Sequence, residues 1–177
     1  MTPQLICVLG AECTGKSTLA QALAAHYGGL WVPEYLRAFC DQHGRTPTQD
    51  EQADIMRIQF DQEEQTVARA KQSSCSYVLC DTAPLMTAIY SEFYFSDSRL
   101  TACAHALHAR YALTLLLQPD LVWEADGVHR SGQPIRDRVH ARLGHALQAS
   151  HHPHIAIGDS GPSRLQAAIR AIDTLTE

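Results

Sequence analysis

The 177-residue sequence contains no apolar run that approaches the roughly 20 residues a helix needs to cross a bilayer. Its N-terminus lacks the basic region, apolar stretch and cleavage site of a secretory signal, so we expect a cytoplasmic protein without a membrane partner. Positive charge is also scarce. The 14 Lys and Arg against 19 Asp and Glu give a formal net charge of -5, which argues against a nucleic-acid partner.

The C-x-x-C motif is absent as well. None of the six cysteines stands in a C-x-x-C pair, which disfavours a disulfide framework or a zinc site and suits reduced thiols in a cytoplasm. We find no internal repeat and no long linker. The length and the 45% hydrophobic content therefore predict one compact domain over residues 1–177.

Short apolar runs alternate with helical patterns along the chain. We expect a helix after the Gly-rich loop, one from near Thr48 to about Ala70 that opens on a Thr48–Glu51 capping box, and one at the end of the chain. Buried parallel strands read as continuous apolar runs. The predicted strands are 5–9, 29–32, 76–81, 111–118 and 154–159. This alternation predicts an α/β fold with a doubly wound, five-stranded parallel sheet, helices on both faces, and ligands beyond the carboxyl ends of the strands.

The loop after the first predicted strand matches the pattern G-x-x-x-x-G-K-S/T, which makes this a predicted P-loop NTPase fold. Its backbone N–H groups and the following helix N-terminus would hold the phosphates of ATP, and Lys16 would reach the β- and γ-phosphates. The predicted ATP-binding residues here are Gly10, Ala11, Glu12, Cys13, Thr14, Gly15, Lys16, Ser17 and Thr18.

Asp81 ends the apolar stretch "YVLCD" and is the predicted partner carboxylate. With the Ser17 hydroxyl it would hold Mg²⁺, the second predicted cofactor. The alternative is that Asp81 caps the helix that follows, since an Asp-Thr-x-Pro stretch also starts helices well.

The same loop occurs in switches, motors and kinases. The chain has no Asn-Lys-x-Asp guanine motif, which disfavours a GTP switch, and it is short for a motor. A small-molecule kinase needs a carboxylate near the acceptor hydroxyl, an acceptor pocket and mobile cations. Glu34 follows the second predicted strand and would lie at the same edge as the loop, with Arg37 one helical turn on. A dipole-favoured first-turn acid is the alternative for Glu34.

The cations and the pocket are predicted farther along the chain. Turn signals at 126–127 and 131–132 indicate a lid over about 124–138. Its Arg130, Arg136 and Arg138 are candidate catalytic residues, each with an exposed structural alternative. The aromatic-rich "YSEFYF", with Tyr90, and Trp123 are candidates for stacking on a planar ring, or for core packing.

Taken together, these motifs resemble the ribosylnicotinamide kinase domain of the NadR type. The resemblance spans nearly the whole chain and rests on the blocks "GAECTGKSTLAQALA", "VPEYLRAF", "VLCDTAPLMTAIYSEFYF", "PDLVWEADGVHR" and "IGDSGPSRLQAA". It implies ATP-dependent phosphorylation of the 5′-hydroxyl of nicotinamide riboside. The chain carries no His-x-Gly-His signature of a nucleotidyltransferase domain, so we do not expect it to make NAD.

The resemblance also implies roles for individual residues. Ser160 and Arg164 would lie near the adenine. The residues implied to bind the riboside are Glu34, Tyr35, Arg37, Thr82, Tyr90, Trp123 and Asp126. Two other functions stay open: a kinase for another nucleoside, and an ATP-binding regulatory module that phosphorylates nothing. Also open are ATP against GTP as donor, Glu34 against Asp81 as base, the lid arginine that acts, and the oligomeric state, a homo-oligomer included.

Overall fold

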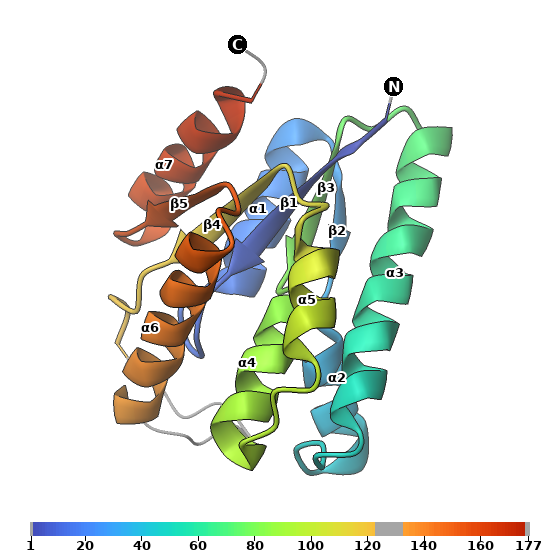
Figure 1. Ribbon diagram of the computed structural model, residues 1–177. Coiled ribbons are helices and arrows are strands. Elements are labelled where there is room, and N and C mark those ends of the chain that lie inside the picture. The colour runs from blue at the N-terminus through green and yellow to red at the C-terminus, as the bar shows by residue number, and fades with distance from the viewer. Residues whose placement is uncertain (1, 123–132, 176–177) are drawn as a thin grey trace.

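The computed structural model describes residues 2–122 and 133–175 and shows a parallel sheet wrapped by helices (Figure 1). Its strands are β1 (Gln4–Leu9), β2 (Leu30–Val32), β3 (Tyr77–Asp81), β4 (Leu113–Leu117) and β5 (His154–Ile157). All neighbours pair in parallel, in the order β2-β3-β1-β4-β5. The predicted five-stranded, doubly wound α/β sheet is confirmed, and each strand lies within the apolar run that predicted it or extends one residue beyond it.

Two layers of helices cover the sheet. The helices are α1 (Lys16–Tyr27), α2 (Tyr35–His43), α3 (Gln52–Gln72), α4 (Pro84–Phe95), α5 (Thr101–His108), α6 (Gln133–Ala149) and α7 (Gly161–Asp173). Helices α1 and α7 pack on one face, and α3 to α6 on the other (Figure 1). Each layer closes its own buried apolar cluster, because alternate strand residues point to opposite faces. No helix among the described residues is long and apolar enough to cross a membrane.

Helix α3 begins later than the sequence predicted. Thr48 and Glu51 form a turn, and the helix starts at Gln52. The Glu51 carboxylate does accept the Thr48 backbone N–H at 2.8 Å, but the Thr48 hydroxyl also donates to Glu51, at 3.0 Å, and does not cap the helix. Half of a capping box has formed, so the prediction was wrong by about one turn.

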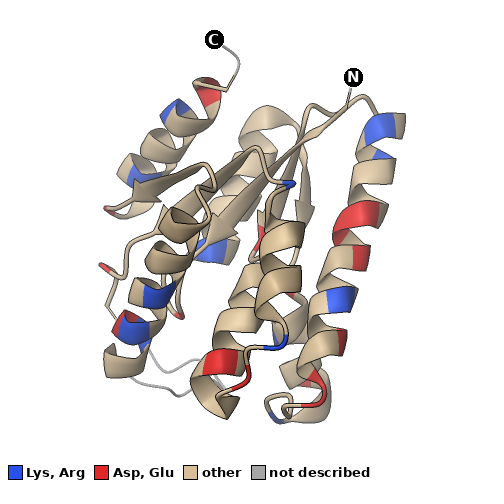
Figure 2. Ribbon diagram, in the orientation of Figure 1, with Lys and Arg blue, Asp and Glu red and all other residues tan. Residues whose placement is uncertain are grey.

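Charge is almost excluded from the described strands. Asp81, at the carboxyl end of β3, is the one Asp, Glu, Lys or Arg within them. The charged positions otherwise lie on helices and loops (Figure 2). A carboxylate is rarely this buried, at 1% exposure, unless it has a partner or a function, so the edge of the sheet at Asp81 is the candidate site.

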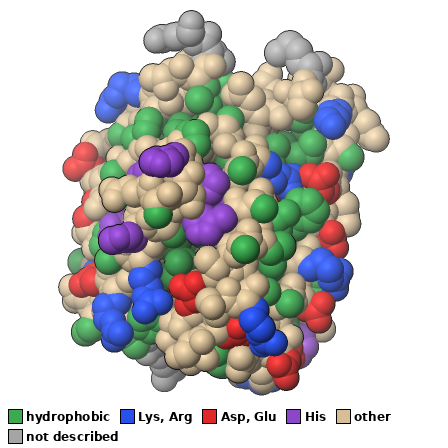
Figure 3. All heavy atoms as spheres, in the orientation of Figure 1, with side chains coloured by type: hydrophobic (Ala, Val, Ile, Leu, Met, Phe, Trp, Pro, Cys, Tyr) green, Lys and Arg blue, Asp and Glu red, His purple; other side chains and the backbone are tan. Residues whose placement is uncertain are grey.

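A group of histidines lies at the opposite end of the sheet, around the start of β5 (Figure 3). The His152 ring centroid is 5.6 Å from that of His105 and 4.9 Å from that of His108. His108 is buried and shares a 2.9 Å hydrogen bond with the Thr114 hydroxyl. Within the described residues, no three His, Cys, Asp or Glu side chains are arranged to hold a metal ion.

Candidate active site

The loop between β1 and α1 curls as a phosphate-binding loop must. Cys13 and Gly15 both adopt left-handed backbone conformations, with φ of 54° and 77°. The Ala11 carbonyl accepts hydrogen bonds from the Thr14 hydroxyl at 2.8 Å and from Lys16 Nζ at 3.2 Å. Helix α1 then begins at Lys16, so its first N–H groups face the loop. The loop predicted from the sequence has formed.

Asp81 lies beside this loop because β3 pairs with β1, with Val8 opposite Asp81. Ser17 and Asp81 line the same cavity. Burial raises the pKa of Asp81, and the Lys16 charge and the nearby Ser17 side chain oppose that shift. Among the described residues, Asp81 Oδ1 has no hydrogen-bond partner. A buried carboxylate oxygen left open beside a hydroxyl fits the oxygen ligands that Mg²⁺ prefers.

The alternative role of Asp81 as a helix cap is not what the structure shows. The residue at the N-cap of α4 is Ala83, and Pro84 opens the helix. Asp81 is the last residue of β3, outside the cap.

Thr82 follows with a strained backbone. Its φ of 78° is rare for a β-branched residue, and a 3.0 Å bond from its N–H to the Val8 carbonyl holds it there. The Thr82 hydroxyl is buried without a partner among the described residues. Strain and open polar atoms of this kind concentrate at functional sites, and here they flank Asp81.

Glu34 stands at the N-cap of α2, directly after β2 and Pro33, but its side chain makes no capping hydrogen bond. Its side chain lines a cavity of about 530 Å³ together with Lys16, Ser17, Arg37 and Asp81. Three neighbouring strands, β1, β3 and β2, thus bring the loop, the buried carboxylate and Glu34 to one cavity. The sequence predicted this shared edge.

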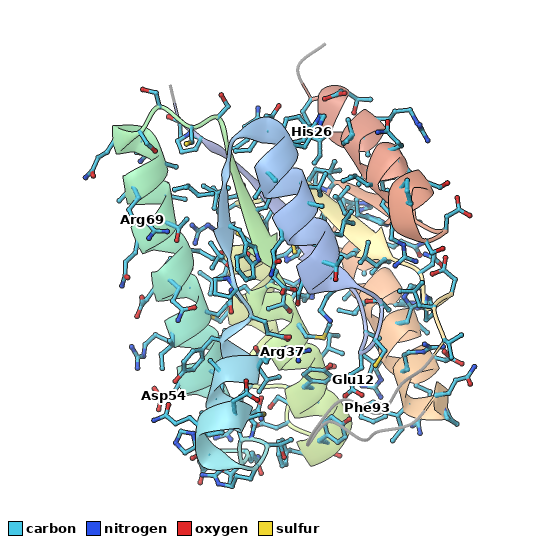
Figure 4. All side chains as sticks on the ribbon, turned by 180° about the vertical axis from the view of Figure 1, so that it is seen from behind. Glu12, His26, Arg37, Asp54, Arg69 and Phe93 are labelled. Atoms are coloured by element: carbon cyan, nitrogen blue, oxygen red, sulfur yellow. The ribbon has the colours of Figure 1, made fainter. Side chains whose placement is uncertain are left out.

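A smaller space adjoins this cavity. It shares Glu34 and Arg37 with it and is also lined by Glu12 and Tyr90. Figure 4 shows Arg37 and Glu12 near each other beneath the start of α1. Burial raises the pKa of Tyr90, and the nearby carboxylates of Glu34 and Glu12 raise it further, so its hydroxyl stays protonated and can donate.

Several predicted residues lie away from these spaces. Tyr35 packs against Phe39 and Ile55, between α2 and α3. Arg136 is buried, and its guanidinium donates to the Leu121 carbonyl at 2.8 Å. Arg138 lies 4.9 Å from the Phe93 ring centroid. None of these three is among the residues that line the two spaces.

The remaining predicted positions divide in two. Ser160 is the exposed N-cap residue of α7. Trp123, Asp126 and Arg130, with most of the predicted lid, lie outside the described residues.

Arg164 reaches the phosphate loop from α7. It is 4% exposed, donates to the Thr14 carbonyl and pairs with the Asp120 carboxylate. Its guanidinium therefore holds the loop from the side of α7. Asp120 was missed by the sequence analysis, although its place just beyond the fourth apolar run was a usable signal.

Other lining residues were also missed. They lie on α1, β2 and α2 or in the turn between β2 and α2, and none belongs to a catalytic motif: Gln21, Trp31, Pro33, Ala38 and Asp41. Only their nearness to Glu34 and the loop helix could have indicated them.

Comparisons with known proteins agree with this geometry. A family model described as an AAA domain matches residues 5–164. No curated protein matches the chain.

Solved structures match in fold. A NadR protein in complex with NR matches with a TM-score of 0.80 at 21% identity, over 99% of this chain and 52% of that one. A NadR protein in complex with NAD and AMP-PNP matches with a TM-score of 0.82 at 22% identity, over 99% of this chain and 50% of that one. A deoxyadenosine kinase from M. mycoides matches with a TM-score of 0.67 at 10% identity, over 97% of this chain and 100% of that one. The chain spans about half the length of the NadR proteins, and the predicted resemblance to their kinase domain is confirmed for the fold.

Proposed function

This chain belongs to the family of AAA domains, and from that premise we propose that it is a small-molecule kinase that transfers the γ-phosphoryl group of ATP to the 5′-hydroxyl of nicotinamide riboside. The product would be nicotinamide mononucleotide. The observation that carries the proposal is the single cavity lined by Lys16, Asp81, Glu34 and Arg37. A nucleotide-binding module that phosphorylates nothing has no need of Glu34 and Arg37 opposite the phosphate loop.

The donor half of the cavity is the phosphate loop. Its N–H groups and Lys16 would bind the triphosphate, and Ser17 and Asp81 would hold Mg²⁺, which when bound would neutralise phosphate charge. Ser17 and Asp81 line the same cavity, which brings these two oxygen ligands together.

Glu34 is the proposed base. Its carboxylate lines both spaces and makes no capping bond, whereas Asp81 is buried beside Ser17 on the donor side. The acceptor hydroxyl would give its proton to Glu34 while its oxygen bonds to the γ-phosphorus and the bond to ADP breaks. Arg37, one turn on, would stabilise the charge on the transferring group.

The smaller space, of about 40 Å³, is too small for a whole riboside, so the riboside would lie in the 530 Å³ cavity with its ring turned toward the smaller space. Tyr90 supplies a ring and a hydroxyl donor there, and the carboxylates of Glu12 and Glu34 favour a cationic pyridinium ring. The NadR protein that matches in fold was solved with NR, which supports this acceptor.

We also propose that residues 1–177 act as one domain, with a lid over about 124–138. Because Arg136 and Arg138 already have protein partners, Arg130 is the lid arginine that we propose for catalysis.

A second acceptor class is favoured by one comparison. The deoxyadenosine kinase from M. mycoides shares the fold over its whole length, so another nucleoside is the alternative acceptor. A panel of acceptors distinguishes the candidate functions. ADP release stimulated by nicotinamide riboside alone supports the proposal, stimulation by other nucleosides alone supports the alternative, and ATP binding without acceptor-dependent release contradicts both.

The Glu34→Gln variant tests the chemistry. Loss of a general base typically costs ~10²–10⁴-fold, so we expect kcat/KM for the riboside to fall by about 100-fold or more. Asp54→Asn, an equal change on the exposed side of α3, is the matched control and should leave kcat/KM unaltered. A Glu34→Gln enzyme within a few-fold of wild type would show that Glu34 is not the base.

A further inference from the structure

The first turn of α2 donates a hydrogen bond to a neighbouring helix. The first N–H groups of any helix lack partners within it, and the N-cap side chain usually supplies one. Here Glu34 makes no such bond. Instead, the Tyr35 N–H donates to Gln59 Oε1 of α3 at 2.8 Å. The Glu34 carboxylate is therefore left to line the cavity.

Gln59 is held in one orientation by a buried neighbour. Its Nε2 donates to Glu63 Oε1 at 3.4 Å, and Tyr111 donates its hydroxyl to the same carboxylate, 2.8 Å from each oxygen. Gln59 is 2% exposed and Glu63 is fully buried. A flipped Gln59 amide would turn its NH₂ group toward the Tyr35 N–H, and two donors would face each other without an acceptor. The Glu63 carboxylate thus selects the orientation that holds α2.

The charge of Glu63 is only partly balanced. Its ion-pair partner Arg110 lies 3.8 Å away, at Glu63 Oε2. Burial raises the pKa of Glu63 to about 7, against the opposing effects of Tyr111, Arg110 and Gln59. Burying this carboxyl costs stability, and nothing in the proposed chemistry uses it directly. A role in holding Gln59 accounts for its place.

We propose that Gln59 is a positioning residue that sets the first turn of α2, and through it the places of Glu34 and Arg37 in the cavity. Helices α2 and α3 pack side by side, as Figure 1 shows. Gln59 does not line either space, and its bond to α2 is the one from the Tyr35 N–H. The kinetic part of this inference rests on the proposed kinase function, whereas the structural part does not.

Hydrogen–deuterium exchange tests the structural part. Gln59→Leu removes the acceptor of the Tyr35 N–H, and we expect amides at the start of α2 to exchange at least about fivefold faster, while those of α1 do not change. Gln59→Glu keeps an acceptor. At pH 6.5 it would share one proton with Glu63, and α2 should stay protected. Gln65→Leu, on the exposed side of α3, is the matched control.

Kinetics test the consequence. In Gln59→Leu, kcat/KM for the acceptor should fall by about 10- to 100-fold, because a displaced catalytic group costs that much. The KM for ATP should change less than about threefold, because the phosphate loop belongs to β1 and α1. Gln59→Glu should recover most of the loss, which a merely destabilised core would not do.

The outcomes distinguish the positioning role of Gln59 from the proposed kinase function. Faster α2 exchange with the loss confined to the acceptor supports the positioning role. Unchanged α2 exchange, or equal losses for ATP and acceptor, overturns it. If the wild type turns over no acceptor, the kinase proposal fails, and α2 exchange alone decides whether Gln59 positions the helix.

Discussion

Gly10 offers a sharp test of the phosphate loop, because its missing side chain lets the loop close on itself. A Cβ atom at this position would lie 2.7 Å from the Thr14 hydroxyl oxygen, 3.1 Å from Leu117 Cβ and 3.3 Å from the Leu117 carbonyl oxygen. Real Cβ atoms essentially never approach a heavy atom within 3.0 Å. Thr14 is fully buried and bonded to the Ala11 carbonyl, so it has no open space to enter. Gly10→Ala must therefore push the loop outward.

The free-energy cost of Gly10→Ala can be bounded. Overpacking a buried site costs ~1–3 kcal/mol, and the stiffer unfolded chain returns ~0.4–1 kcal/mol. The net loss is ~0–2.6 kcal/mol, and its centre of about 1.3 kcal/mol lowers the Tm by ~3–5 °C for a chain of this size. Because the displaced atoms belong to the loop, we also expect the affinity for ATP to fall by about tenfold.

Thermal unfolding and ATP titration check both effects, with Gly144→Ala as control. Gly144 lies inside α6, and a Cβ there would sit 3.8 Å from Leu116 Cδ2, an ordinary contact. Removing a helix-interior glycine should stabilise the protein by ~0.5–1 kcal/mol and leave ATP binding intact. A Gly10→Ala protein with unchanged Tm and unchanged ATP affinity would refute the tight closure of the loop.

Other predictions concern the loop lysine, the loop cysteine and the buried histidine. Lys16→Ala should abolish turnover while shifting the Tm little, since its one described hydrogen bond is to Ala11 at 3.2 Å; turnover within tenfold of wild type would contradict its role. Cys13 lines the cavity, so saturating ATP should slow its alkylation severalfold, and equal rates with and without ATP would place the triphosphate elsewhere. Burial lowers the pKa of His108 to about 3. Below the ordinary His pKa of about 6.5, the unfolded chain therefore binds a proton that the folded protein does not. The free energy of unfolding falls as pH drops from 6.5 toward 3, by at most ~1.4 kcal/mol per pH unit. His108→Gln should flatten that decline in Tm between pH 6.5 and 5; parallel declines in both proteins would exclude His108 as its source.

The fold could be predicted because its signals are local. The central strands β1, β3 and β4 are mainly apolar and buried along almost their whole length, as strands of a parallel sheet covered on both faces must be. The edge that joins the phosphate loop, Asp81 and Glu34 follows from parallel topology, since the carboxyl ends of neighbouring strands meet at one edge.

The rest depends on contacts between distant segments. Gln59 and Glu63 read as ordinary polar residues of a helix, and only the packing of α3 against α2 and Tyr111 gives them a role. Arg164 lies 150 positions from the Thr14 carbonyl to which it donates. The start of α3 was misplaced because Thr48 and Glu51 satisfy each other within a turn, which the capping pattern alone does not distinguish from a helix start.

The proposed reaction is transfer of the γ-phosphoryl group of ATP to the 5′-hydroxyl of nicotinamide riboside. Its most direct test is to incubate the protein with ATP, Mg²⁺ and the riboside and to identify the product by mass spectrometry and ³¹P NMR, with Lys16→Ala as the blank. We expect nicotinamide mononucleotide, with the phosphate on the 5′-oxygen and one ADP formed per product, and no product from Lys16→Ala. An unmodified riboside, in the presence of a protein shown to bind ATP, would contradict it.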